Sequence, residues 1–412
     1  MDSDGRREAR DPAVCDRAGA ARLSAASKGH TARVEGKVAL RLAAAPVLVG
    51  AVVAFALDAR ARDAADQAQG PFLLVTGLLL LGVVADADGV FRWASLRLLG
   101  VTTHARGLLV VALLLVAVVT ALLNLDTAVV FLTPILLGAA RGADVDEEPF
   151  LYGVVLMANA SSLLLPGANL TNLLVLSGEP VGGATFALRI LPAALAAALV
   201  TAAGLVLLAG RRPRPAVAPR ARRAPAGATG VRPLGALACV LAAVLVLALP
   251  HPGLPVLAVG LLAAAVRIRE RRVDPGAAVE AVGPLALATL FALSVLLGLV
   301  ARVWSGPTDL LASASAWTTC AIGALAAVGL NNLPAAVLLS ATPPPHPRAL
   351  LLGLNLGPNL AVTGSLSSYL WFKAARNAGA HPSARRFSMI GVPLGISAML
   401  AGLATIALVG PS

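Results

Sequence analysis

The chain has 412 residues, of which 58% are hydrophobic and only 13% are charged. A water-soluble domain needs roughly a quarter of its residues charged, so this composition excludes one. The net charge of +12 would favour a nucleic-acid partner only if the basic residues formed a patch on a globular domain. Several uncharged stretches can instead cross a hydrocarbon layer of about 30 Å, and their continuous apolar character predicts helices rather than barrel strands. The sequence therefore predicts an all-α polytopic protein of the lipid bilayer, with no nucleic-acid partner.

The predicted elements begin with a disordered cytoplasmic tail, residues 1–37, which is polar and mixed in charge. Two apolar stretches, 107–139 and 310–342, are each too long for one helical span and too short for two. Each has a polar break near its middle, at 124–127 and 331–334, so we expect two re-entrant helical hairpins. The other apolar segments predict nine full spans, at 38–57, 71–86, 150–177, 184–208, 234–249, 253–266, 283–301, 349–372 and 387–410.

The basic residues test this layout independently. If the N-terminus is cytoplasmic and each hairpin returns to its own side, 28 Lys and Arg residues fall in cytoplasmic segments and 5 fall outside. Reading either hairpin as a full span would move every later segment to the opposite side and weaken this asymmetry. An excess of Lys and Arg is typical of cytoplasmic loops. We therefore expect a multi-pass protein of the cytoplasmic membrane with its N-terminus inside the cell.

An Arg- and Pro-rich linker, 209–233, divides the chain into two halves, 38–208 and 234–410. Each half has the order spans, hairpin, interrupted span and final span. The first hairpin would open to the cytoplasm and the second to the outside, which predicts an inverted repeat. Inverted repeats with broken helices near the midplane are the plan of many secondary transporters. The basic linker is expected to lie in the cytoplasm, where anionic lipid is its expected contact.

Between residues 107 and 140, Asp126 is the single charged residue. A charge at this depth costs about 2.5–3.5 kcal/mol on insertion scales, so a functional role is the default interpretation. It could bind a cation, carry a proton or contact a polar substrate. The alternative role is a helix cap for the second limb of the hairpin, because Asp-Thr is a good helix start.

Two spans are interrupted by polar residues and helix breakers, around Pro166 in the first half and Pro358 in the second. The N-termini of half-helices suit anions or hydroxylated solutes, and unwound carbonyls suit Na⁺. A single Ser or Asn in a membrane helix usually serves only helix packing, through a hydrogen bond to a neighbouring helix. Four polar clusters at matching places in the two halves weaken this purely structural interpretation. The predicted substrate- and ion-binding residues are Asn124, Asp126, Thr127, Asn159, Ser161, Ser162, Asn169, Thr171, Asn172, Asn331, Asn332, Asn355, Gly357, Asn359, Thr363 and Ser365.

These motifs resemble those of arsenical pump membrane proteins. The run L-D-T-A at 125–128, followed by L-T-P at 132–134, resembles their N-D-G-A…L-T-P signature. N-N-L-P at 331–334 resembles their N-N-x-P, and 355–371 is similar to their D-L-G-P-K…G-S-L…L-W segment. The resemblance covers about 70–410 and implies the ion transporter superfamily, which includes citrate-transporter-like permeases. It implies arsenite or antimonite export driven by protons or by a separate ATPase subunit, and a homodimer.

The chain departs from the arsenical pattern at three positions. Asn159 and Asn355 stand where that family usually has acids, and Asn359 stands where it usually has Lys. We expect a secondary active transporter that holds a small inorganic or organic solute between the hairpin tips and the broken helices. Arsenite or antimonite efflux is the first candidate. An organic-anion permease for citrate or dicarboxylates, or a Na⁺/H⁺ antiporter, is the alternative.

Enzymatic activity is not expected. The five His residues all fall in tails, loops or interfaces, and the sequence has no G-x-x-x-x-G-K-[ST] phosphate loop. The three Cys residues show no metal or redox spacing. We therefore predict no catalytic residue, no metal site and no cofactor, with H⁺ or Na⁺ as the coupling ion.

Overall fold

The computed structural model describes residues 44–102, 104–177, 182–209 and 232–410. Within these ranges the regular structure is helical, and no strand occurs. The predicted tail 1–37, nearly all of the linker 209–233 and the start of the first predicted span lie outside the described residues. A helix over Ala44–Leu57 opens the described chain.

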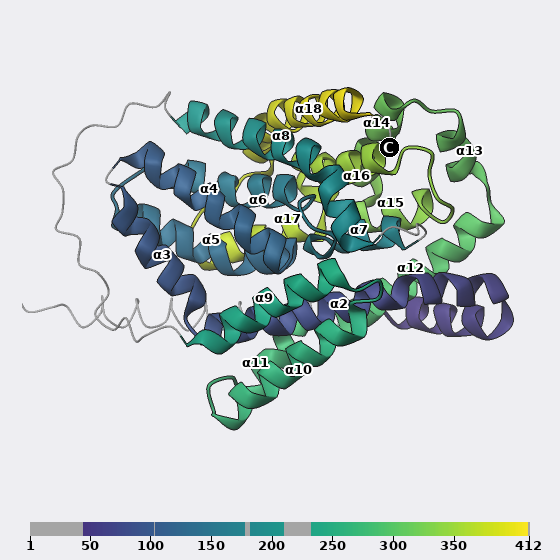
Figure 1. The fold of residues 1–412 in the computed structure, drawn as a ribbon, viewed down its shortest axis with the longest axis horizontal. Helices are drawn as coiled ribbons and strands as arrows, with labels where there is room; N and C mark the ends of the chain where they lie inside the picture. The colour runs from purple at the N-terminus through teal and green to yellow at the C-terminus, as the bar shows by residue number, and fades with distance from the viewer. Residues whose placement is uncertain (1–43, 103, 178–181, 210–231, 411–412) are drawn as a thin grey trace, which may run out of the picture.

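One group of helices, which we call the side bundle, lies along one edge of the molecule (Figure 1). Within it, α2 contacts α9, α10 and α12. The side bundle consists of α2 (Ala59–Ala87), α9 (Pro233–Ala248), α10 (Gly253–Arg269), α11 (Pro275–Val282) and α12 (Pro284–Val303). The start of α2 differs from the expected start of the second span at 71. Asp58 caps the helix twelve residues earlier by accepting a hydrogen bond from the Arg60 N–H at 2.8 Å.

The remaining helices from α4 to α8 and from α14 to α18 form the main bundle. Its first part follows α3 (Val90–Val101) and contains α4 (Ala105–Leu122), α5 (Leu125–Gly142), α6 (Glu148–Ser161), the 3-10 turn Pro166–Ala168, α7 (Leu170–Leu176) and α8 (Gly183–Ala209). The chain breaks between α4 and α5 at Leu123 and Asn124, inside the stretch predicted as a hairpin, and the two limbs pack against each other. The predicted interruption at Pro166 is the non-α segment between α6 and α7.

The second part of the main bundle has the second break and the second interruption. It contains α14 (Ala316–Leu330), α15 (Asn332–Leu339), α16 (Pro347–Leu356), the 3-10 turns Gly357–Asn359 and Val362–Gly364, α17 (Leu366–Asn377) and α18 (Ala384–Val409), and it follows α13 (Gly306–Ala312). Asn331 separates α14 from α15 with a positive φ of 80°. In the structure, the α-helix is therefore interrupted within both predicted hairpins and both predicted interrupted spans, at the positions that the sequence indicated.

Helices from distant parts of the sequence pair in the main bundle. α5 packs against α17, and α7 packs against α15. Asp126 at the start of α5 accepts a hydrogen bond from Ser367 at the start of α17, and Arg141 near the end of α5 donates to the carbonyl of Ala378 just after α17. α5 and α17 therefore run parallel, with their amino-terminal ends at the same level.

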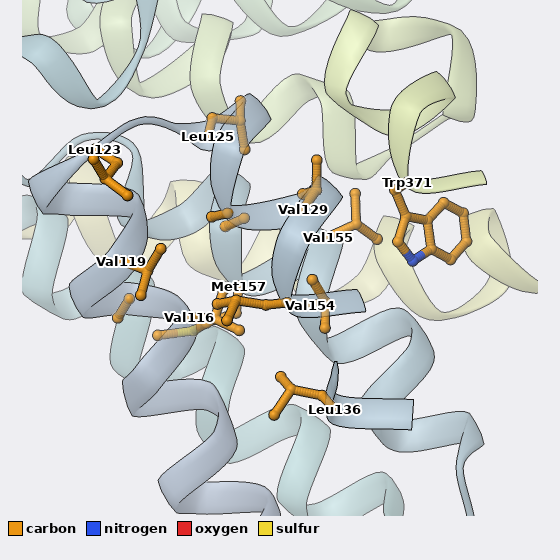
Figure 2. Packing of buried hydrophobic residues seen from close by; sticks show 14 of the residues in the cluster. Val116, Val119, Leu123, Leu125, Val129, Leu136, Val154, Val155, Met157 and Trp371 are labelled. Carbon is orange, nitrogen blue, oxygen red and sulfur yellow. The ribbon is translucent and has the colours of Figure 1, made fainter. Parts of the chain in front are cut away.

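The largest apolar core joins α4, α5, α6 and α17. Figure 2 shows Val116, Val129 and Val155 gathered between these helices, with Trp371 beside them. Trp371 is fully buried, and its Nε1–H donates to the carbonyl of Leu151 at 2.8 Å, so its one polar atom is satisfied.

Close helix contact next to this core depends on a glycine. A Cβ added to Gly353 on α16 would lie 2.1 Å from the carbonyl oxygen of Cys320 on α14. Small residues allow backbones to approach in this way where membrane helices pack.

The outer faces of the bundle are apolar. Within the described ranges, six helices are long and apolar enough to cross a membrane, namely α2, α4, α5, α8, α18 and the segment Pro275–Val303. Leu188 and Leu199 on α8 are 71% and 67% exposed. Large exposed apolar faces on helices whose backbone groups are satisfied internally are suited to lipid. The fold is therefore that of a polytopic membrane protein.

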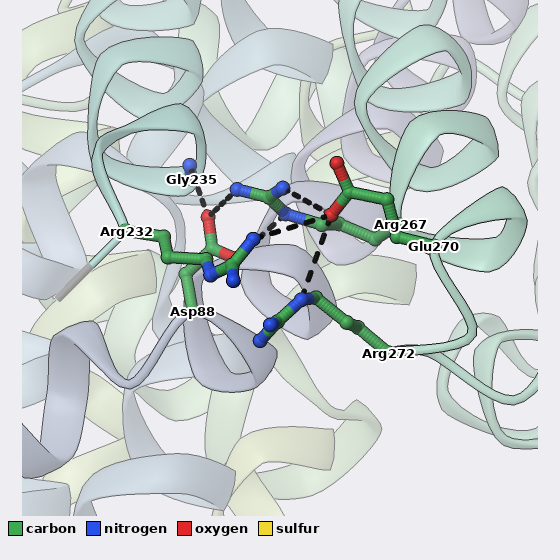
Figure 3. A network of polar contacts seen from close by, with 6 residues as sticks. All are labelled: Asp88, Arg232, Gly235, Arg267, Glu270 and Arg272. Carbon is green, nitrogen blue, oxygen red and sulfur yellow. Dashed lines mark hydrogen bonds and ion pairs between the residues drawn. The ribbon is translucent and has the colours of Figure 1, made fainter. Parts of the chain in front are cut away.

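A polar network fastens one end of the side bundle (Figure 3). Asp88, after the end of α2, pairs with Arg267 on α10, and each is only 4% exposed. Asp88 also accepts a hydrogen bond from the Gly235 N–H at the start of α9, at 2.7 Å. Glu270 extends the network by accepting from Arg267 at 2.6 Å. The network therefore connects α2, α9 and α10, and α9 is the first helix after the linker that divides the chain.

We expect Arg267→Met to destabilise the protein by about 3–5 kcal/mol, because it leaves the Asp88 carboxylate buried without its partner. Arg272→Gln is a matched control, since its 3.6 Å contact with Glu270 is solvent-exposed and such pairs are worth about 1 kcal/mol or less. Unfolding of the purified variants in detergent would measure both changes. Equal stability of Arg267→Met and the parent would contradict a structural role for this pair.

Candidate functional site

Four of the predicted site residues start the helices that follow the breaks. Asn124, Asn169, Asn331 and Ser365 are the N-caps of α5, α7, α15 and α17, and each side chain accepts a hydrogen bond from a first-turn N–H. These caps fix the helix starts, because the first N–H groups of a helix have no partner within it. The positive dipole ends of four helices are therefore placed at the breaks.

Asn355, at the end of α16, is the centre of a hydrogen-bonded junction between the two interrupted spans. Its Oδ1 accepts from Ser162 Oγ at 2.6 Å and from Asn169 Nδ2 at 2.7 Å. Its Nδ2 donates to Asn172 Oδ1 at 2.8 Å and to the carbonyl of Leu351 at 2.8 Å. All four hydrogen-bonding positions of this side chain are used, and Asn355 is fully buried. One side chain thus holds both sides of the first interruption.

A second amide pair lies beside this junction. Asn159 Nδ2 donates to Asn359 Oδ1 at 2.8 Å, and Asn359 Nδ2 donates to the carbonyl of Leu156 at 3.2 Å. Both side chains are fully buried. The resemblance described above would place an acid and a Lys at these two positions. The structure therefore has a neutral amide pair where an ion pair would stand.

The amide pair makes a testable prediction. Asn359→Lys should cost about 3–5 kcal/mol of stability, because it buries a charge opposite a neutral amide. Adding Asn159→Asp should recover part of that loss, with a favourable coupling energy of about 0.5–3 kcal/mol in a double-mutant cycle. Unfolding of the four purified proteins measures the cycle. A coupling energy of zero would mean that the two side chains do not act on each other.

Asp126 lies in the first turn of α5, but it is not the cap of that helix. The cap is Asn124, whose Oδ1 accepts from the Thr127 N–H at 2.7 Å. The Asp126 carboxylate instead accepts a hydrogen bond from Ser367 Oγ on α17. The capping role considered for Asp126 therefore belongs to Asn124, and the acid joins the first hairpin to the second interrupted span.

The second hairpin tip contacts the interrupted span that follows it. Asn331 Nδ2 donates to the carbonyl of Thr363 at 3.3 Å, and Thr363 Oγ1 donates to the carbonyl of Val328 at 3.2 Å. Thr363 is exposed, whereas Asn332 is 5% exposed. Asn331, Asn332 and Thr363 therefore form a separate tip, outside the hydrogen-bonded junction around Asn355.

Three other predicted residues have local roles. Ser161 Oγ donates to the carbonyl of Met157 at 2.7 Å, one turn earlier in its own helix. A Cβ on Gly357 would lie 2.7 Å from the backbone of Ala324, so this glycine permits close contact with α14. Ser365 Oγ caps α17 and lies 2.9 Å from Ser368 Oγ.

Four buried polar atoms at the first tip and the first interruption have no hydrogen-bond partner among the described residues. They are Asn124 Nδ2, Thr127 Oγ1, Asn159 Oδ1 and Thr171 Oγ1. Buried polar groups are nearly always hydrogen-bonded, so an unpaired group needs a reason. Together they supply two hydroxyls, an amide donor and an amide acceptor, which a polar solute or water could satisfy.

The sequence prediction omitted Ser367 from the site. Its signal was present, because the residues after each interruption follow one pattern, N-L-T-N at 169–172 and S-L-S-S at 365–368. In this alignment Ser367 corresponds to Thr171, which was predicted. Ser367 contacts Asp126, whereas the Thr171 hydroxyl is one of the unpaired atoms.

A cavity of about 500 Å³ lies between the side bundle and the main bundle. Gln67, Leu74 and Val246 line it from the side bundle, and Pro166 and Leu173 line it from the main bundle. It therefore reaches the turn inside the first interrupted span.

The helical fold, its lipid-suited faces and its two interrupted spans define a polytopic membrane transporter. A model of the CitMHS family, described as a citrate transporter, matches residues 30–354, and the chain belongs to this family. The family is part of the ion transporter superfamily expected from the motifs. The comparison with curated proteins gave no match.

Among solved structures, the chain is similar to the YdaH transporter of Alcanivorax borkumensis, which was described as having an unusual topology. The TM-score is 0.53 at 12% sequence identity, and the match covers 91% of this chain and 98% of that chain. At this identity the similarity concerns the fold alone.

Proposed function

We propose that this chain is a secondary active transporter of the cytoplasmic membrane that moves a small citrate-type organic anion by alternating access. The observation that carries the proposal is the set of unpaired buried atoms at the first hairpin tip and the first interruption. They offer both donors and acceptors, as a solute with carboxylate and hydroxyl groups requires. Membership of a citrate transporter family favours this solute class over arsenite.

An inverted repeat of nine spans and two re-entrant hairpins underlies the proposed mechanism. Two features support it. The order hairpin, interrupted span and long helix occurs in α4–α8 and again in α14–α18. The cross-contacts are also reciprocal, because α5 packs on α17 while α15 packs on α7. Such repeats commonly place the solute where the broken helices meet.

The proposed orientation, with the N-terminus in the cytoplasm, is supported by contacts between helix ends. Arg386 pairs with Glu148, and both belong to the side assigned to the cytoplasm. Arg348 donates to the carbonyl of Gly410 at 2.8 Å, and both belong to the opposite side. The Asp88 network likewise joins segments assigned to the cytoplasm. The 28:5 distribution of basic residues then sets which side is inside.

Alternating access would move the main bundle against the side bundle. The cavity between them supports this division, since it leads from the side bundle to Pro166 in the first interruption. Asp126 is the proposed site of the coupling ion, either H⁺ or Na⁺, because it is the acid at the hairpin tip and its described partner is the neutral Ser367.

Arsenite remains a second candidate on one observation. The hydrogen bonds of the junction come from Asn and Ser side chains and backbone carbonyls, and in the described part of the chain none of them involves Lys or Arg. Neutral groups of this kind suit an uncharged hydroxylated solute, whereas an anion gains more from a guanidinium.

A flux screen in proteoliposomes tests the proposal. Labelled citrate, succinate and arsenite would each be offered to the purified full chain with an imposed H⁺ or Na⁺ gradient, with protein-free liposomes as the control. We expect gradient-driven uptake of citrate or succinate. Uptake of arsenite alone would support the second candidate, and no gradient-driven uptake of any of the three would contradict both.

A further inference from the structure

A cavity of about 400 Å³ lies away from the hairpin tips and the junction, between the start of α8, the start of α14, the start of α16 and the end of α18. Arg189 on α8, Arg348 on α16 and His346 supply its basic groups. Most of its other lining is apolar and includes Trp317, Leu403 and Ile406. The cavity therefore combines a cationic part with apolar walls.

The two guanidinium groups have no acid to neutralise them in the described ranges. Arg348 donates one hydrogen bond to the carbonyl of Gly410. The side chain of Arg189 makes no hydrogen bond or ion pair with the described residues. The two charges line the same cavity, and like charges repel. In addition, His346 precedes α16 without capping it through its side chain, so the positive end of that helix adds to the same field.

A related cavity of about 370 Å³ provides the comparison. It lies between the start of α6, the end of α8 and the start of α18, so it uses the same long helices at their opposite ends. There, Arg386 pairs with Glu148 at the start of α6. In the first turn of α16 the cavity has Arg348, and no described acid lines this cavity, whereas the other cavity has base and acid. Among the described residues the cavity therefore has an excess of positive charge, which an anionic ligand would balance.

The surroundings identify the chemistry of that ligand. Leu188 on α8 is 71% exposed, Leu408 on α18 is 88% exposed and Trp317 on α14 is 49% exposed. These exposed apolar side chains lie on three helices that line the cavity, and Trp is enriched where a membrane meets water. Basic pockets between transmembrane helices on the cytoplasmic or matrix side bind anionic headgroups. This cavity offers the same chemistry, because guanidinium groups bind phosphate and its apolar walls suit an acyl chain.

We propose that this cavity is a binding site for an anionic phospholipid, with the headgroup phosphate between Arg189 and Arg348 and an acyl chain along Leu403 and Ile406. The ligand would balance the positive charge of the described lining. It also holds α8 and α16 together at the end of the molecule that the sequence predicts to face outside.

Native mass spectrometry of the purified full chain in detergent, titrated with phosphatidylglycerol, tests the proposal. Each arginine near a membrane surface contributes about a fivefold preference for anionic lipid, so Arg189→Gln and Arg348→Gln should each weaken binding about fivefold, and the double variant about 25-fold. Arg60→Gln is the matched control, because Arg60 is exposed and its side chain is outside the cavity. Arg348→Lys should retain most of the binding, which separates lost charge from misfolding.

Two further arms distinguish the sources of the phosphate. Phosphatidylcholine has the same phosphate with no net charge, and we expect it to bind at least about fivefold more weakly. Inorganic phosphate should fail to displace phosphatidylglycerol, because it cannot fill the apolar walls. Equal phosphatidylglycerol binding by the parent and the double variant, an equal loss in Arg60→Gln, or displacement by inorganic phosphate would each overturn the proposal.

Discussion

Replacing Asp126 with asparagine is expected to abolish or uncouple transport while leaving membrane insertion near normal. The change keeps the size of the side chain and removes its charge, which is proposed to hold the coupling ion. A contact to a charged group is worth about 1.5–3 kcal/mol, so gradient-driven uptake should fall about 10- to 100-fold. Initial uptake rates in proteoliposomes, measured across a pH series, would detect both the loss and any uncoupling.

Ser367→Ala is the control for this variant. It removes the hydroxyl that donates to Asp126 but keeps the carboxylate, so a smaller loss of about fivefold is expected. Expression level and elution from size-exclusion chromatography would establish normal insertion of both variants. If Asp126→Asn transports like the parent at every pH, the acid has only a structural role.

Asn355→Leu is expected to reduce both stability and transport. The substitution keeps the volume of the side chain but leaves Asn169 Nδ2 and Asn172 Oδ1 without their partner, while Ser162 can still donate to the carbonyl of Asn159. Each buried polar group left unpaired costs about 1–3 kcal/mol, so the two together should cost about 2–6 kcal/mol. Transport should also be lost, because the two interrupted spans would no longer be held in register.

The matched control is Asn377→Leu, which makes the same chemical change at an exposed position near the end of α17. Surface substitutions of this kind usually change stability by about 0.5 kcal/mol or less. Unfolding midpoints of the purified proteins in detergent compare the two variants. Similar midpoints for both would mean that the junction contributes little to stability.

The positions of the breaks could be predicted from the sequence because length and polarity agree there. A stretch too long for one span and too short for two must bend, and Asn124 and Asn331 stand in the middle of the two such stretches. Helix boundaries outside the membrane were harder to predict. Residues 59–70 are polar enough to suggest a loop, yet the Asp58 cap starts α2 before them.

The partners across the site could not be predicted, because a single sequence does not show which distant side chains meet. Asp126 and Ser367 are 241 residues apart, and Asn159 and Asn359 are 200 apart. The role of Asn124 was also ambiguous, since Asn124 and Asp126 are both good caps and stand two positions apart. Only the backbone geometry decides between them. The structure assigns the cap to Asn124 and leaves the acid facing α17.

The hydrogen bonds of Asn355 have a consequence for folding during synthesis and membrane insertion. Asn172 and Asn355 are 183 residues apart, so the first interruption is synthesised long before its partner exists. Until then Asn169 Nδ2 and Asn172 Oδ1 must be satisfied by water or by lipid headgroups, whereas Asn172 Nδ2 has the carbonyl of Ser162 within the same half. Contacts between distant residues also form slowly, since the closure of long loops costs entropy. The N-terminal half therefore completes the polar contacts of its interrupted span only when α16 has been synthesised.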